Sequence, residues 1–188
     1  AVSAYAFEIK GAITVSQPNG GETWFVGETT RKIMWQAYGT IPTVKLEYSK
    51  GGAWTEIIAS TAAGKGAGEY AWPAVANAIS SLCKIRVSDT RDAGVNDESN
   101  GVFNIKGKLL ITVPNGSTRW VAQTSNHNIE WVRTGSIANV KITYAVDGGQ
   151  STNVIIDGAS GESPYRWDNL PNHVSSTYRI KIEDVLDP

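Results

Sequence analysis

The chain has 188 residues, and its 17 lysine and arginine side chains nearly balance its 18 aspartate and glutamate side chains. Neither sign of charge forms a run that would follow a phosphate backbone, so we expect no nucleic-acid partner. No apolar stretch approaches the length of a membrane span, and we expect no membrane insertion. Seven tryptophans, seven tyrosines and nineteen glycines favour short strands separated by turns, so the composition predicts an all-β fold.

Apolar side chains recur at every second residue along much of the chain, which is the spacing of a strand with one buried face. Ile33 and Trp35 make one such pair, and Tyr70 and Trp72 make another. Glycine turns such as Gly51-Gly52 separate these segments. We expect strands near residues 13–17, 23–26, 30–36, 43–49, 54–60, 68–73 and 82–88, with a last one at 101–106.

The second half of the sequence repeats the first. Adding 96 to the residue number carries the Pro-Asn-Gly turn at 18–20 onto the same three residues at 114–116. The same register matches Trp24 with Trp120, Ile33 with Ile129, Trp35 with Trp131 and Tyr48 with Tyr144; further on the offset becomes 95 and matches Trp72 with Trp167 and Ile85 with Ile180. The predicted fold class is therefore two tandem immunoglobulin-like (fibronectin-like) β-sandwich domains.

The repeat also includes the start of the chain. Phe7, Ile9, Lys10 and Gly11 match the Phe-x-Ile-Lys-Gly segment at 103–107, again at an offset of 96. The domains are thus predicted as a last strand at 1–11 that belongs to or completes a neighbouring copy, a first sandwich at 12–107, and a second sandwich at 108–188 that lacks its final strand. Phe7, Ile9 and Lys10 are the predicted residues of an intersubunit strand.

Candidate catalytic residues are scarce. The chain has two histidines, His127 and His173, and one cysteine, Cys83. Two histidines give little basis for a Ser-His-Asp triad or a histidine metal site. The acidic residues lie mostly in turns, so we expect no enzymatic activity. Cys83 falls in an apolar strand pattern and is predicted to be a core side chain.

One acidic segment, residues 89–100, gathers oxygen ligands of the kind that calcium prefers. Asp89, Asp92 and Asp97 are the candidate Ca²⁺ ligands, and no other cofactor is expected. The spacing matches no EF-hand, and the alternative is a solvated loop between the sheets in which the aspartates cap turns.

Six of the seven tryptophans form pairs between the two copies, which favours positions in the core. Trp54 has no tryptophan partner and stands beside the Gly51-Gly52 turn. It is therefore the candidate ligand contact, since sugar-binding modules present exposed aromatic rings.

The segment Pro-Asn-Gly-Gly-Glu-Thr-Trp at 18–24, together with Ile-Met-Trp at 33–35, Tyr-Ala-Trp at 70–72 and Lys-Ile-Arg-Val-Ser-Asp at 84–89, resembles the repeat domain of serine/threonine-rich GPI-anchored surface proteins. That family also includes yeast cell-wall glucan-assembly proteins, and in bacteria and archaea similar domains occur as tandem arrays in secreted proteins. The resemblance implies a β-sandwich and a surface location, and it brings no catalytic residues. The second copy departs from the pattern at residues 117–119 and at Gln123.

The sequence as a whole predicts a non-catalytic structural unit of an extracellular filament or tandem-repeat surface protein. Its partners would be copies of itself, joined head-to-tail either in one continuous polypeptide or as separate subunits that exchange the strand at 1–11. Two alternatives stay open. The chain could be a carbohydrate-binding module that contacts cell-wall polysaccharide, or a passive spacer in a large secreted adhesin or enzyme.

Overall fold

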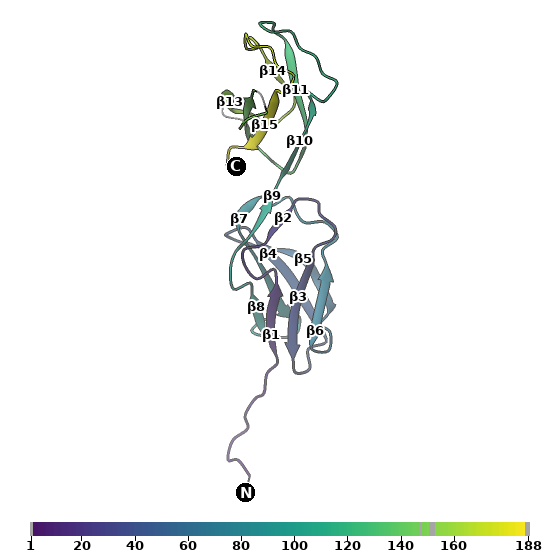
Figure 1. Ribbon diagram of the computed structural model, residues 1–188. Coiled ribbons are helices and arrows are strands. Elements are labelled where there is room, and N and C mark those ends of the chain that lie inside the picture. Colours follow the sequence, from purple (N-terminus) through teal and green to yellow (C-terminus); the bar gives the residue numbers. More distant parts are fainter. Residues whose placement is uncertain (1, 147, 151–152, 187–188) are drawn as a thin grey trace. The chain divides into compact units, whose positions relative to one another are not determined.

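The structure is a computed structural model, and it describes residues 2–146, 148–150 and 153–186. Its regular elements are strands, and the described residues include no helix that could cross a membrane. Contacts divide the chain into two compact units, Ala1–Lys106 and Gly107–Pro188 (Figure 1). The prediction of two tandem β-sandwich domains is confirmed.

The first unit consists of two sheets packed face to face (Figure 1). One sheet is antiparallel, with the order β1 (Ala12–Gln17), β3 (Lys32–Tyr38) and β6 (Ala67–Ala71). The other sheet has the order β2 (Thr23–Phe25), β9 (Phe103–Lys106), β7 (Ser80–Asp89), β4 (Thr43–Ser49) and β5 (Trp54–Ala62), and β8 (Asn96–Glu98) also pairs with β7.

The core of the first unit lies between these sheets because the strands alternate inward apolar and outward polar side chains. On β3, Ile33 and Trp35 are fully buried while Lys32 is exposed. The indole N–H of Trp35 donates to the carbonyl of Ala63 at 2.9 Å, so this buried donor is paired. Cys83 is also fully buried, as its apolar pattern predicted, and burial raises the pKa of its thiol.

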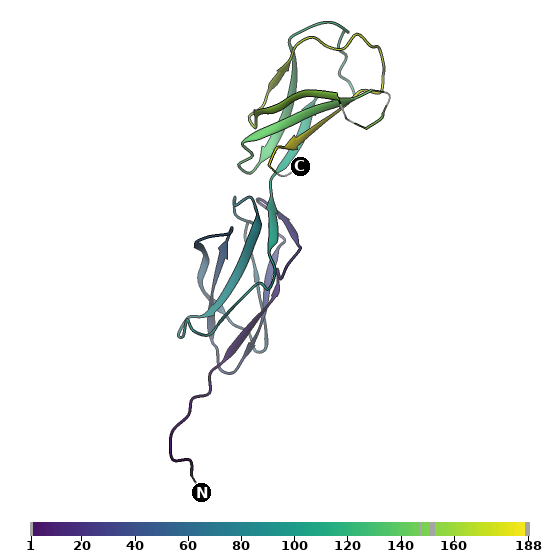
Figure 2. The same cartoon turned by 90° about the vertical axis from the view of Figure 1, so that its left-hand side faces the viewer.

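The second unit repeats this plan with fewer strands (Figure 2). Its first sheet has the order β10 (Lys108–Val113), β11 (His127–Thr134) and β14 (Tyr165–Trp167), and its second has the order β13 (Asn153–Ser160), β12 (Asn139–Ala145) and β15 (Arg179–Asp184). The indole of Trp131 donates to Gly161 at 3.0 Å, as Trp35 does in the first unit. Within residues 107–186, apart from the undescribed positions 147, 151 and 152, no strand corresponds to β2, β8 or β9.

The structure corrects one detail of the predicted strands. Part of the expected loop at 89–100 forms β8, which pairs with β7 through Asp97 and Val87. Residues 2–11 form no strand in this single chain, and the strand that completes a neighbouring copy stays a prediction.

Candidate interaction site: an exposed apolar segment and an open sheet

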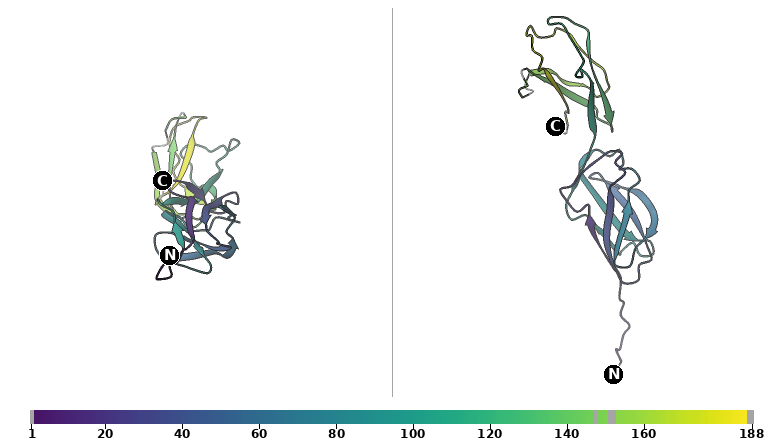
Figure 3. Two further views of the ribbon diagram at one scale, coloured as in Figure 1. Left: turned by 90° about the horizontal axis from the view of Figure 1, so that it is seen from below. Right: turned by 45° about the vertical axis from the view of Figure 1, so that its right-hand side comes forward.

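The segment 2–11 exposes alternate apolar side chains. Phe7 and Ile9 are 79% and 85% exposed, and Val2 and Tyr5 are similarly open to solvent. Figure 2 and the right-hand view of Figure 3 both show this segment running away from the first unit without returning to it. A contiguous apolar stretch of this kind is unusual on a protein surface and marks an interaction site.

The segment is held to the first unit only at its end. Lys10 Nζ lies 2.9 Å from Asp92 Oδ2. The hydrogen bond to Asp92, with the charges of Asp92 and Glu8, raises the pKa of Lys10, and the hydrogen bonds from Lys10 and the Gly94 N–H lower the pKa of Asp92. The contact therefore fixes where the segment leaves the sandwich, and the apolar residues before it make no part of the first unit's core.

The glycine between the segment and β1 packs in the same way as the glycine between β9 and β10. A Cβ on Gly11 would stand 2.9 Å from Ile41 Cδ1, and a Cβ on Gly107 would stand 2.7 Å from Ile137 Cδ1. Glycine suits both places because such a Cβ would also lie 2.9 Å from the Tyr38 carbonyl oxygen and 3.0 Å from the Thr134 carbonyl oxygen, and backbone atoms cannot move aside as a side-chain end can. The sequence match between residues 7–11 and 103–107 therefore extends to the packing of the glycine that ends each segment.

In the first unit the residues that match Phe7 and Ile9 are core residues. Phe103 and Ile105, both on β9, are 0% and 1% exposed. β9 lies between β2, with which it is parallel, and β7, with which it is antiparallel. The ring of Phe103 contacts that of Trp24, with centroids 5.1 Å apart. β9 thus closes the first sandwich on one side.

The aromatic cluster of Trp24, Tyr48 and Trp72 that lies against Phe103 recurs in the second unit as Trp120, Tyr144 and Trp167. In the first unit, Trp72 lies 6.1 Å from Trp24 and 5.5 Å from Tyr48 between ring centroids. The matching centroid distances in the second unit are 6.2 Å from Trp167 to Trp120 and 5.3 Å from Trp167 to Tyr144. Trp24 is fully buried, whereas Trp120 is only half-buried. In the second unit the further ring against Trp120 is that of His127, with centroids 4.9 Å apart.

The sheet edge beside this cluster is open. β15 pairs with β12, and no strand in the described part of the unit pairs with its other edge. Ile180 and Ile182 on β15 are half-buried, while the matching Ile85 and Val87 on β7 are fully buried. An edge that combines unpaired backbone groups with apolar side chains is a template for another strand.

Trp54, the predicted ligand contact, begins β5 and is half-buried. The guanidinium of Arg86 lies over its ring, 4.4 Å from the ring centroid. A sugar stacking on Trp54 would have to use the other face of the ring. The carbohydrate contact stays a prediction.

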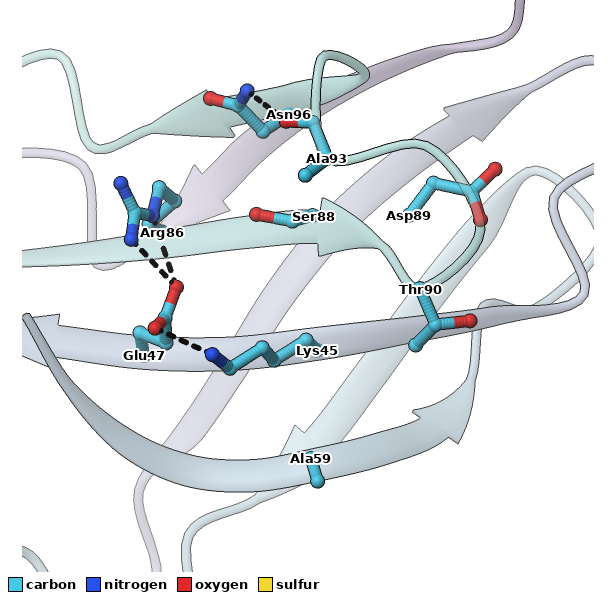
Figure 4. Close-up of a pocket in the computed structure, with 9 residues that line it drawn as sticks. All are labelled: Lys45, Glu47, Ala59, Arg86, Ser88, Asp89, Thr90, Ala93 and Asn96. Atoms are coloured by element: carbon cyan, nitrogen blue, oxygen red, sulfur yellow. Dashed lines mark hydrogen bonds and ion pairs between the residues drawn. The ribbon is translucent and has the colours of Figure 1, made fainter.

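Arg86 also borders the shallow cavity drawn in Figure 4, which has a volume of about 310 Å³. Glu47 lies there between Lys45, whose Nζ is 2.8 Å from Oε1, and Arg86, whose terminal nitrogen is 2.8 Å from Oε2. Burial, the largest influence on Glu47, raises its pKa, but the hydrogen bonds from Lys45 and Arg86 outweigh it and leave the pKa below its ordinary value. These charges are satisfied by one another.

The three predicted calcium ligands have separate partners. Asp89 Oδ1 accepts the N–H of Arg91 at 2.9 Å. Asp92 binds Lys10, and Asp97 Oδ2 accepts the N–H of Val15 at 2.7 Å. Within the described ranges no three His, Cys, Asp or Glu side chains are grouped so that they could hold a metal ion. The calcium site stays a prediction, and these carboxylates have structural contacts.

Sequence reasoning identified the segment but not the whole site that fits it. It placed Trp120 in a core on the strength of its match with Trp24, and the structure leaves it half-buried. Once the contact between Phe103 and Trp24 is known, the sequence repeat indicates this exposure. The match of Phe103 is Phe7, which lies in the segment before the first unit's β1 and not in the second unit.

Comparison with models of protein families finds no match, and a search of curated proteins finds none. Among solved structures, the fibronectin(III)-like modules of CbhA from Clostridium thermocellum are 18% identical, cover 84% of this chain and 79% of their own, and give a TM-score of 0.25. A chimeric titin Z1Z2-Z1Z2 tandem is 13% identical over 90% of this chain and 83% of its own, with a TM-score of 0.32. The FN1–FN3 domains of chicken CNTN1 are 12% identical over 87% and 62%, with a TM-score of 0.28.

Proposed function

We propose that this chain is a non-catalytic structural unit of an extracellular filament or tandem-repeat surface protein, in which copies join head-to-tail. In this arrangement the segment 2–10 of one copy enters the second unit of another copy beside residues 175–180, which match the part of β7 that β9 and Ser99 contact. There it takes the place that β9 takes in the first unit, as one strand of a completed sandwich.

The observation that carries the proposal is a contrast in burial between matched residues. Phe7 and Ile9 are 79% and 85% exposed, and the matching Phe103 and Ile105 are 0% and 1% exposed. Complete burial of a phenylalanine or isoleucine side chain contributes about 1.5–3 kcal/mol, so the two residues together offer about 3–6 kcal/mol of favourable free energy. That is a substantial part of the stability of a small domain.

The matching place in the first unit is already occupied by β9, so the segment has no room there. The second unit offers the half-buried Trp120 and residues 175–178, which match the part of β7 that pairs with β9. A second unit of the same sequence therefore offers the segment both apolar contact and backbone pairing.

The proposal covers two forms of assembly that share this contact. In one, the copies follow one another in a single polypeptide, and the segment closes the repeat that precedes it. In the other, separate chains exchange the segment. The predicted resemblance to repeat domains of surface proteins, which form tandem arrays in secreted proteins, supports the extracellular setting.

The experiment is sedimentation velocity and light scattering of the full chain over a range of concentrations, comparing wild type with Phe7→Asp. We expect wild type to form oligomers whose mass grows with concentration. The Asp variant should stay monomeric, since it removes the burial of Phe7 and would bury a charge; the loss of Phe7 burial alone corresponds to at least a tenfold weaker association. Because Phe7 is exposed in the first unit, circular dichroism and thermal unfolding should be unchanged.

The matched control is Tyr38→Asp, which introduces the same charge at an exposed aromatic residue on β3, 57% open to solvent. This variant should assemble as wild type does. Assembly that persists in Phe7→Asp, or a wild-type chain that stays monomeric at millimolar concentration, contradicts the proposal.

A further inference from the structure

Ser99 joins the two sheets of the first unit through a buried hydroxyl. The residue is 1% exposed, and it precedes β9 in the chain. Its Oγ accepts the N–H of Ile85 on β7 at 3.0 Å and donates to the carbonyl of Pro18, just after β1, at 2.7 Å. Its own N–H donates to the Ile85 carbonyl at 2.9 Å. Three hydrogen bonds therefore fix the position of the chain that leads into β9.

The repeat assigns a counterpart to each member of this arrangement. Subtracting 96 from Ser99 gives Ser3, adding 96 to Pro18 gives Pro114, and adding 95 to Ile85 gives Ile180. Ile180 lies opposite Tyr144 on β12, as Ile85 lies opposite Tyr48 on β4. The backbone groups of Ile180 that correspond to those bound by Ser99 therefore face the open edge of β15. Ser3 itself is exposed, and its Oγ donates to the Tyr5 carbonyl at 3.0 Å.

We infer that Ser3 sets the register of the segment in the second unit of another copy, by taking the place of Ser99 between Pro114 and Ile180. This inference rests on the proposed function and adds the residue that decides which pairing is formed. Ser3 acts as a positioning residue, while Phe7 and Ile9 supply the burial.

The apolar side chains alone do not define one register. Tyr5, Phe7 and Ile9 are spaced by two, so a slip of two residues would put Tyr5 in the place of Phe7 and Phe7 in the place of Ile9. Both arrangements bury aromatic or aliphatic groups on the same face. They differ in Ser3, because the slipped arrangement takes its hydroxyl away from Pro114 and Ile180 and leaves those groups unpaired.

The test is disulfide cross-linking of the full chain in a Cys83→Ala background. In the first unit Ser80 lies opposite Ile105, and the matching pair across the proposed interface is Ser175 and Ile9. Ser175→Cys with Ile9→Cys reports the native register, and Ser175→Cys with Phe7→Cys reports the register slipped by two. With Ser3 present we expect intermolecular cross-linking of the first pair and little of the second.

Ser3→Ala should lower the ratio of native to slipped cross-linking by about tenfold or more, since it removes a buried hydroxyl from two partners. Adding Ala4→Ser to Ser3→Ala should not restore the ratio, because it puts the hydroxyl one residue out of place. An unchanged ratio in Ser3→Ala overturns the role of Ser3 while the native cross-link still supports the proposed function. Absence of both cross-links when Ser3 is present overturns this inference, while the proposed function is decided separately by the assembly of wild type and Phe7→Asp.

Discussion

At the scale of single residues, Glu47 on β4 is a buried carboxylate held between two cations. It is 8% exposed, and it binds Lys45 and Arg86, the residue whose guanidinium also covers Trp54. Glu47→Gln should destabilise the first unit by about 1–3 kcal/mol at pH 7, because it leaves two cations without their carboxylate. The measurement is urea unfolding, and Glu56→Gln, a more exposed acid on β5, is the control that should change little.

The same carboxylate makes a prediction about pH. The pKa of Glu47 is lowered in the folded state. Its ionised side chain therefore contributes fully to the free energy of unfolding above the unfolded pKa of about 4.3, and this contribution is lost as the pH falls through the folded pKa. The difference in stability between wild type and Glu47→Gln should therefore be constant from pH 7 to 5 and shrink below pH 4. A difference that stays constant down to pH 2.5 contradicts the assignment.

At the scale of elements, β8 shows how an acidic segment is used in the fold. Asp97 on β8 accepts the N–H of Val15 at 2.7 Å, at the point where the register of β1 shifts against β3. This hydrogen bond ties the edge of one sheet to the other. Asp97→Ala should destabilise the first unit by about 1–3 kcal/mol, since it leaves the Val15 N–H unpaired.

This prediction distinguishes a structural role from the calcium hypothesis. If Asp97 acts through Val15, thermal unfolding of wild type should be the same in EDTA and in millimolar Ca²⁺, and Asp97→Ala should lower both midpoints equally. A midpoint that rises with Ca²⁺ in wild type but not in the variant would support a calcium site instead.

Regular alternation made several of the strands easy to predict. β3, β4 and β7 carry apolar residues at every second position along most of their length, and this pattern alone decides which face is buried. β8 has three polar residues, so periodicity offers no signal, and its pairing depends on β7 lying beside it. Local sequence could not reveal a strand whose formation depends on its neighbour.

The candidate site could be predicted from the sequence only in part. The match of Phe7 and Ile9 with β9 indicated a strand in need of a partner. The half-exposed state of Trp120 could not be read from its match with Trp24, because burial depends on the strand that covers the residue. Ser3 was not singled out, since one serine matching another carries little weight until the three hydrogen bonds of Ser99 are known.

At the scale of the whole molecule, the proposal predicts that the second unit gains stability when another copy follows it. Fusing two copies in tandem places a segment 2–10 directly after the first copy's second unit. Completing that sandwich buries Phe7, Ile9 and the half-buried Trp120, and it pairs residues 175–178 and the start of β15. In the single chain below its association concentration, these gains are missing.

Hydrogen exchange measured by mass spectrometry can report this change, because the amides at an open strand edge exchange faster than those in a paired ladder. Peptides that cover residues 175–184, which include β15, should exchange uniformly in the single chain. In the fusion they should divide into two equal populations, the slower one from the completed unit. Phe7→Asp in the second copy alone should return the fusion to one population, whereas Tyr38→Asp at the same copy should not. A single population in the unmodified fusion would mean that the segment does not close the sandwich even when it is covalently in place.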